Sequence, residues 1–240
     1  MRPATGELVD YLGDGDSWSG EGGLANRLVE HIGISALALL VAFVVAVPLA
    51  VWLGHIGRGG ALAINIGNAA RAVPTFALLV LFVMLPDPLG ANTFSFVLAL
   101  ALFSLPPLLT NTYVGMREVD AGVVDAARGM GMSGLQIVRR VELPLAVPLL
   151  MTGVRLAAVQ VVATATVLGL VGGGALGRII KSGFSNQNQG QILGSAIVVT
   201  LLALATEIVF ELLERRVSRR PSSRTEDDSE VQRENLSVAA

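Results

Sequence analysis

The sequence predicts an all-α membrane protein with about five transmembrane helices, and its composition and charge distribution support that prediction. The 240 residues are 52% hydrophobic and only 15% charged, with a mean hydropathy of +0.65, whereas about a quarter of a soluble domain is normally charged. Residues 32–54, 88–116 and 156–177 contain no Asp, Glu, Lys or Arg. Each run is long enough for a helix across the ~30 Å bilayer core, which needs about 20 mostly apolar residues.

Residues 1–30 precede the first apolar run and form a polar, acidic segment. Two arginines, Arg2 and Arg27, are outnumbered there by acidic residues. A cleaved signal peptide begins with a basic region followed at once by a short apolar core, and this segment has neither feature. We therefore expect the first apolar run to be a retained membrane helix, with residues 1–30 on the extracellular or periplasmic side.

The spans are expected at residues 32–53, 70–86, 93–113, 145–170 and 191–213. The second is the weakest, because its strongly apolar part, residues 73–85, is short for a membrane span. A separate sixth span over residues 61–70 stays open as an alternative.

Basic residues set the expected orientation, because Lys and Arg concentrate in cytoplasmic loops. With the N-terminus outside and the C-terminus inside, only Arg178 and Lys181 fall in an outer connection. The resulting membrane domain covers residues 31–216 and contains a cytoplasmic loop at 117–143. Residues 217–240 are dense in charge and serine, so we expect a disordered cytoplasmic tail. The inner arginines are Arg58, Arg117, Arg128, Arg139, Arg140, Arg215, Arg216, Arg219 and Arg220.

The cytoplasmic loop has the pattern of two short helices. Apolar residues within 123–127 give the first helix one apolar side, and "GMGM" at 129–132 interrupts it, since glycine adopts backbone angles that other residues avoid. Ser133 can cap a second helix over 134–141, which Pro144 is expected to end before the next span. A simple connection could be much shorter, so we expect this loop to bind a partner. The alternative is an amphipathic segment that lies on the inner leaflet.

At these residues the sequence resembles the cytoplasmic signature of the membrane subunits of bacterial ATP-binding-cassette (ABC) importers. That signature is Glu-Ala-Ala, three residues, Gly, nine residues, Ile, one residue and Leu-Pro. Both gaps are kept in this chain, with Asp in place of Glu and Val in place of Ile. The matching positions are Asp125, Ala126, Ala127, Gly131, Val141, Leu143 and Pro144.

The resemblance implies the type I ABC importer transmembrane fold, with the loop as a coupling helix that docks on a separate ATPase subunit. It also implies an extracellular or periplasmic substrate-binding protein and a second permease chain, in a bacterial cell membrane. The chain has no G-x-x-x-x-G-K-[ST] loop to hold phosphates, so we expect a non-catalytic subunit whose partner binds ATP-Mg. It also has no cysteine, and we expect no metal site or cofactor in it.

The substrate class is expected from a looser resemblance. Residues 45–54, 70–81, 153–183 and 212–216 look most like permeases for glycine betaine, choline, carnitine and related osmoprotectants. Permeases for methionine or another amino acid are the alternative, and a passive osmotic channel or secondary transporter is a more remote one. Quaternary ammonium groups bind aromatic faces, but the chain has only two Trp and two Tyr. We therefore expect selectivity to reside in the separate binding protein.

Polar groups inside the spans are candidates for the substrate path, because such groups usually face a bundle interior or a cavity. Helix–helix hydrogen bonding is the alternative explanation for them. Arg155 and Glu207 lie about 15 Å and about 10 Å from the inner ends of their spans at 1.5 Å per residue. We expect the two charges to pair and steady the bundle; the alternative is that Arg155 snorkels to the inner interface. The path candidates are Pro74, whose missing N–H would loosen its span, and Asn111, Thr112, Gln160, Thr164 and Thr166.

Overall fold

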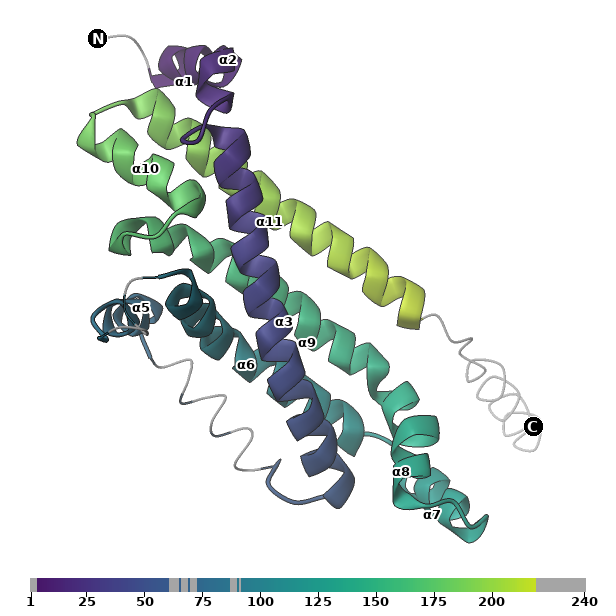
Figure 1. Ribbon diagram of the computed structural model, residues 1–240. Helices are drawn as coiled ribbons and strands as arrows, with labels where there is room; N and C mark the ends of the chain where they lie inside the picture. The colour runs from purple at the N-terminus through teal and green to yellow at the C-terminus, as the bar shows by residue number, and fades with distance from the viewer. Residues whose placement is uncertain are drawn as a thin grey trace, which may run out of the picture.

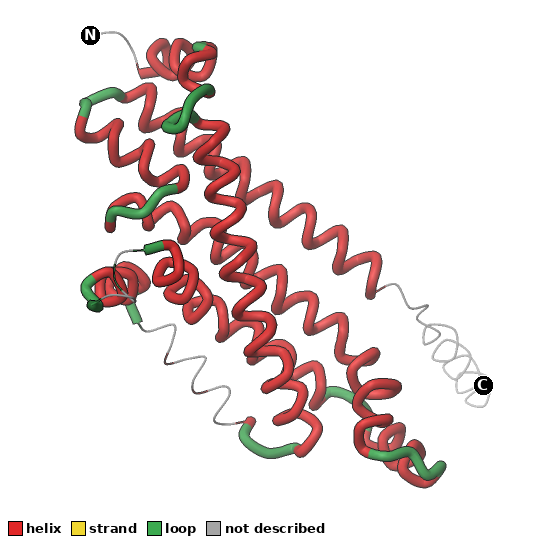
Figure 2. Tube along the Cα trace, viewed as in Figure 1, coloured by secondary structure: helices red, strands yellow, loops and turns green. Residues whose placement is uncertain are grey.

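The computed structural model describes residues 4–60, 65, 69, 73–86, 90 and 92–218, and every regular element in these ranges is helical (Figure 2). In chain order they are α1 (Ala4–Gly13), α2 (Gly15–Trp18), α3 (Leu24–Ile56), α5 (Thr75–Val83), α6 (Thr93–Arg117), α7 (Ala121–Gly129), α8 (Gly134–Ile137), the π turn η1 (Val138–Glu142), α9 (Leu143–Ala165), the 3-10 segment η2 (Thr166–Val171), α10 (Ala175–Ser185) and α11 (Gln189–Ser218).

Four of the described helical stretches are long and apolar enough to cross a bilayer: α3, α6, α11 and the continuous helix Gly134–Val171. They coincide with four of the expected spans. The remaining expected span, 70–86, contains the nine-residue α5, and its residues 70–72 lie outside the described ranges. So does most of 61–70, where a sixth span stayed open, and all of 219–240, where a disordered tail is expected.

The first long helix begins earlier than expected. α3 starts at Leu24, inside the segment that the sequence suggested would be polar throughout. Leu24 is fully buried with Leu176 and Ile179 of α10. Packing against α10 therefore stabilises helical structure before residue 32, where the apolar run begins.

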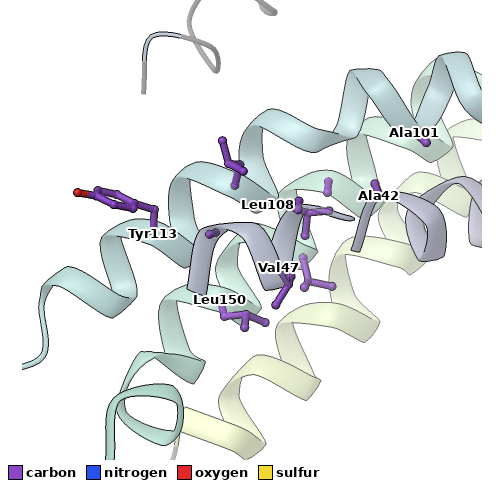
Figure 3. Close-up of a cluster of buried hydrophobic side chains, with 11 residues drawn as sticks. Ala42, Val47, Ala101, Leu108, Tyr113 and Leu150 are labelled. Atoms are coloured by element: carbon purple, nitrogen blue, oxygen red, sulfur yellow. The ribbon is translucent and has the colours of Figure 1, made fainter. Parts of the chain in front are cut away.

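Two buried clusters fix the direction of the long helices. The first half of α3 packs with the first half of α6 and the second half of α9, for example through Ala38, Leu100 and Val161. The second half of α3 packs with the second half of α6 and the first half of α9, as Figure 3 shows for Val47, Leu108 and Leu150. α3 and α6 are therefore parallel to each other, and α9 runs antiparallel to both.

Small residues on α3 allow this close packing. Ala38, Ala42, Ala46 and Ala50 are all fully buried and recur every fourth residue, so they lie along one face of the helix. Gly54 continues the same face, and a Cβ placed on it would lie 2.4 Å from Met116 Cβ. Small side chains let helix backbones approach closely, which drives helix association inside a membrane.

Short helices lie at both ends of the bundle, and α5 lies beside the start of α6 (Figure 1). α1, α2 and α10 lie at one end, here called the α1 end, and α7 and α8 lie at the other, the α7 end. α1 packs against the start of α11, where a Cβ on Gly190 would lie 2.2 Å from Glu7 O and one on Gly194 2.6 Å from Tyr11 Cδ1. Gly190 and Gly194, four residues apart on α11, thus lie on the surface that α1 packs against.

Candidate functional site

The helix α7 at the α7 end has a defined start and a defined stop. Asp120 caps its N-terminus by accepting a 3.1 Å hydrogen bond from the Val123 N–H. At its C-terminus the Met132 N–H donates to Ala127 O and the Gly131 N–H donates to Arg128 O, at 3.2 and 2.9 Å. These two bonds form a Schellman motif, which requires a left-handed residue just after the helix. Gly131 is that residue, with φ +81°.

The second helix of the loop begins as expected but does not end as expected. Ser133 opens α8 with a capping box, in which its N–H donates to Gln136 Oε1 at 2.8 Å. The prediction that Pro144 ends this helix is wrong, because helical structure continues from Gly134 to Val171. The π turn η1 explains the continuity: the Leu143 N–H reaches back to Val138 O, and a wider turn eases the clash that a proline ring makes with the preceding turn.

A small apolar core joins α7 to α8 and η1. It consists of the buried Val124, Ala127 and Ile137, with Val119, Met132 and Val141 packed against them. Ala127 is only 2% exposed, so its small side chain serves packing within the chain rather than contact with another surface. A Cβ on Gly131 would meet nothing within 4 Å, so this glycine is required for its backbone angle. Close approach to a partner stays a prediction for Ala126, which is exposed.

The outward side of this loop mixes charges with exposed apolar side chains. Asp125 and Arg128 form an exposed ion pair of 3.1 Å. Met130 is 76% exposed and Leu135 is 61% exposed. Surfaces that combine exposed apolar groups with charges are suited to binding a protein. We call residues 121–142 the coupling unit, and we call Val123, Asp125, Ala126, Arg128, Met130 and Leu135 its exposed surface.

The coupling unit also contacts the end of α3. Nδ1 of His55, in the last turn of α3, lies 2.7 Å from Oε2 of Glu142, the last residue of η1. Neither residue was assigned this role from the sequence, where 87 positions separate them. The available signal was Glu142 itself, because a carboxylate directly before an apolar Leu-Pro step needs a partner when it is buried.

Arg155 lies between two carboxylates of α11. Its Nη1 is 3.2 Å from Glu207 Oε1, the pair expected from the sequence. Its Nε is 3.2 Å from Glu214 Oε2, an ion pair without hydrogen-bond alignment. Glu214 also accepts a 2.7 Å hydrogen bond from Thr152 Oγ1. The sequence had given Glu214 no role, and a signal was present: it lies seven residues after Glu207, which is two turns along the same helix face.

The expected path residues are distributed over several helices. Gln160 Nε2 donates to Phe103 O at 3.0 Å, and Asn111 Nδ2 donates to Pro107 O at 2.8 Å. Pro74 precedes the first residue of α5, so it does not loosen the interior of a helix as expected. Thr112 is fully buried and Thr164 and Thr166 are partly buried. The Thr112 and Thr166 hydroxyls have no hydrogen-bond partner among the described residues.

The described residues contain no group of three or more His, Cys, Asp or Glu side chains that could hold a metal ion. Taken together, the coupling unit supplies a surface and a mechanical connection, and the bundle supplies a membrane domain. This combination is that of a polytopic membrane protein with a folded loop exposed at one end of its bundle.

Comparison with known proteins identifies the class. The model of the family described as binding-protein-dependent transport system inner membrane component matches residues 42–220. The chain belongs to this family and is a multi-pass inner-membrane permease of a bacterial ABC importer, a non-catalytic component of the transporter. The all-helical membrane architecture and the resemblance seen at the coupling unit are thereby confirmed.

Three relatives illustrate the similarity. The chain is 34% identical to the glycine betaine/carnitine/choline transport system permease protein OpuCB of Bacillus subtilis, over 82% of this chain and 89% of that one. It is 36% identical to the choline transport system permease protein OpuBB of the same organism, with the same coverage. It is 35% identical to the carnitine transport permease protein OpuCB of Listeria monocytogenes, over 79% of this chain and 85% of that one.

Solved structures show the same fold. The inward-facing MetNI methionine ABC transporter aligns with a TM-score of 0.70 and 23% identity, over 82% of this chain and 96% of that one. An amino acid ABC transporter crystallised with histidines aligns with a TM-score of 0.66 and 19% identity, over 80% of this chain and 93% of that one. These likenesses establish the type I ABC importer fold.

Proposed function

We propose that this chain is the permease of an importer that moves glycine betaine, choline, carnitine or a related compatible solute into the cell. The proposal for the solute rests on relatives that are 34–36% identical over most of the chain and carry those substrates in their names. The proposal for the mechanism rests on one observation: the coupling unit is folded as a compact knob and continues without a break into α9.

The coupling unit docks on a separate ATPase subunit, which binds ATP-Mg. Asp125 and Arg128 present charges to the partner, and the small side chain of Ala126 lets it approach closely. Met130 and Leu135 supply apolar contact area. Gly131, Val141, Leu143 and Pro144 act behind this surface, since they set the turn and the entry into α9. Because α8, η1 and α9 form one helix, displacement of the coupling unit displaces a membrane span.

The chain crosses the membrane about five times, with its N-terminus outside and its C-terminus inside. α3 and α6 are parallel and both end at the α7 end, as expected if a further span over residues 70–86 lies between them in the chain. α5 packs on the start of α6 and on η2, because Leu79 is buried with Phe96 and Leu168. The arginine-rich coupling unit then marks the α7 end as cytoplasmic, and the binding protein docks at the α1 end.

A second permease chain completes the substrate path, because one such bundle is too small to enclose it. The Thr112 and Thr166 hydroxyls are buried without a partner among the described residues, so they would reach the solute only when the helices move apart. Asn111 and Gln160 donate hydrogen bonds to main-chain carbonyls, so we propose that they stabilise the helices as well as line the path. Pro74 and Thr164 complete the set. The ion pair of Arg155 with Glu207 steadies α9 against α11.

Uptake into vesicles that hold the full assembly tests the proposal. Labelled glycine betaine, choline, carnitine and methionine are each offered with the binding protein, with and without ATP inside. We expect ATP-dependent uptake of at least one quaternary ammonium solute and none of methionine. Uptake of methionine alone would support an amino acid permease, and uptake without ATP would support a channel or a secondary transporter.

A further inference from the structure

The C-terminal end of α3 packs against α6 and the coupling unit. Gly54 faces Met116 at the end of α6, where a Cβ would meet the Met116 side chain at 2.4 Å. The helix then stops, because Gly57 adopts a left-handed φ of +65° and its N–H bonds Gly54 O at 3.2 Å. His55 lies in this last turn, so the helix end fixes where the imidazole is presented.

The imidazole of His55 joins two parts of the coupling unit. On one edge, Nδ1 lies 2.7 Å from Glu142 Oε2, and the Glu142 side chain is 7% exposed. A carboxylate can only accept, so the imidazole donates through Nδ1–H. On the other edge, a Cβ on Gly134 would lie 3.3 Å from Nε2, so Gly134 leaves room for the ring at the start of α8.

The hydrogen bond between His55 and Glu142 is of the strong kind. It joins an ionisable donor to a carboxylate that is almost completely removed from solvent, and charge-assisted bonds are roughly twice as strong as neutral ones. If the donor were removed, the carboxylate would stay desolvated without a partner, which is unfavourable. The structure therefore favours keeping the two residues together when either element moves.

Three long helices meet the coupling unit, and two of them are joined to it by the chain itself. α6 enters α7 through residues 118–120, and η1 continues into α9. α3 has no such direct connection, because His55 and Glu142 are 87 residues apart. The side-chain bond between them attaches α3 to the same unit that α6 and α9 reach covalently.

We propose that His55 and Glu142 are positioning residues that transmit movement of the coupling unit to α3, so that α3, α6 and α9 move together when the ATPase subunits close. This inference rests on the proposed function. Neither side chain is assigned a contact with ATP or solute. Without the bond the unit still docks and ATP is still hydrolysed, but the end of α3 follows the coupling unit less closely, because packing on α6 and α9 then has to transmit the movement. Less solute therefore moves per ATP.

Two amide substitutions form a matched pair for the test. In His55→Asn the amide nitrogen takes the place of Nδ1 and can still donate to Glu142. In His55→Gln the amide lies one carbon further out, where Nε2 was, and faces Gly134 instead. Both variants are neutral and similar in size, so they differ mainly in whether the bond to Glu142 survives. Glu142→Leu removes the bond from the other side.

The assembly is reconstituted in vesicles with its ATPase and binding protein, and three quantities are measured: co-purification of the ATPase, ATP hydrolysis, and solute moved per ATP. We expect the solute moved per ATP by His55→Asn to stay close to the value for the unmodified protein. We expect His55→Gln and Glu142→Leu to lower solute per ATP about tenfold, the effect of one charged hydrogen bond, while the ATPase still co-purifies.

Equal solute per ATP in His55→Asn and His55→Gln would overturn the inference, whether both values are normal or both are low. Two normal values would mean that the bond carries no movement, and two low values would mean that the ring matters only for packing. This comparison stands even if Glu142→Leu fails to fold. Failure of the proposed function looks different, because the unmodified chain would then not retain the ATPase or would move solute without ATP.

Discussion

Gln160 of α9 donates a 3.0 Å hydrogen bond to the main-chain oxygen of Phe103 in α6. In a regular helix that oxygen would accept the N–H of residue 107, but Pro107 has none. The side chain of a neighbouring helix thus replaces the donor that the proline removes, which is how membrane helices accommodate proline.

Replacing Gln160 with Met should therefore destabilise the membrane domain. The Phe103 carbonyl would lose its partner inside an apolar region, at a cost of about 0.6–2 kcal/mol. Denaturant titration of the detergent-solubilised chain measures the change in the free energy of unfolding. Thr200→Val is the control, because among the described residues that exposed hydroxyl donates to Ala196 O within its own helix. Equal stability of the two variants would contradict the role given to Gln160.

Gly131 and Gly129 provide a matched pair in the coupling unit. A Cβ at either position would meet nothing within 4 Å, but only Gly131 has a left-handed φ, of +81°. We expect Gly131→Ala to weaken the turn by roughly 1–2 kcal/mol and to lower the affinity for the ATPase, while Gly129→Ala does neither. Gly131→Asn should fall between them, because Asn tolerates this conformation. ATPase pull-down measures the affinities, and equal binding by the two Ala variants would refute the turn-based explanation.

Removing Arg155 should harm the protein more than removing either of its partners. Arg155→Met leaves Glu207 and Glu214 near each other with no positive charge between them, which we expect to cost about 1–3 kcal/mol of stability. Adding Glu207→Gln and Glu214→Gln to that variant should restore part of the loss. Thermal unfolding in detergent measures both steps. A triple variant that is no more stable than Arg155→Met would show that the charges do not interact.

A simple exchange of Arg155 and Glu207 is a poorer test, and the structure shows why. The exchange would place a carboxylate at position 155, next to the carboxylate of Glu214, which lies 3.2 Å from the present guanidinium. Repulsion between them would mask any restored pairing with position 207. Neutralising the acids avoids this new contact.

The packing of α1 on α11 depends on Gly190. A Cβ there would lie 2.2 Å from Glu7 O, whereas a Cβ on Gly33 of α3 would meet nothing within 4 Å. We expect Gly190→Leu to displace α1 and Gly33→Leu to leave it in place. A glutamate-specific protease should then cut after Glu7 faster in the first variant, because the segment is no longer packed on α11. Unchanged cleavage would mean that α1 is not held by this contact.

The sequence was most informative where a property is local. Mostly apolar runs predicted about five spans, and four of these coincide with long helices, because crossing a bilayer requires continuous apolar sequence. Spacing around Gly131 predicted two short helices and a break between them, since capping and left-handed turns depend on neighbouring residues. The continuation through Pro144 was missed, because a π turn leaves no distinct sequence pattern.

Contacts between distant residues could not be predicted in the same way. His55 has no local feature that selects Glu142, and their meeting depends on how the ends of α3, α6 and η1 pack. Ala127 fits the family signature, but only the fold shows that it is buried inside the coupling unit while Ala126 stays exposed. α10 and α1 were not expected, because amphipathic helices at the end of a bundle are too short to stand out as spans.

The central claim is that the exposed surface of the coupling unit docks on a separate ATPase subunit. The chain contains no cysteine, so a single cysteine at the exposed Ala126 can be labelled with a maleimide without background. We predict rapid labelling of Ala126→Cys in the isolated permease and strong protection once the ATPase subunit is bound. Asn188→Cys, at an exposed position near the α1 end, should label equally in both states. Equal labelling of Ala126→Cys with and without bound ATPase would contradict the account.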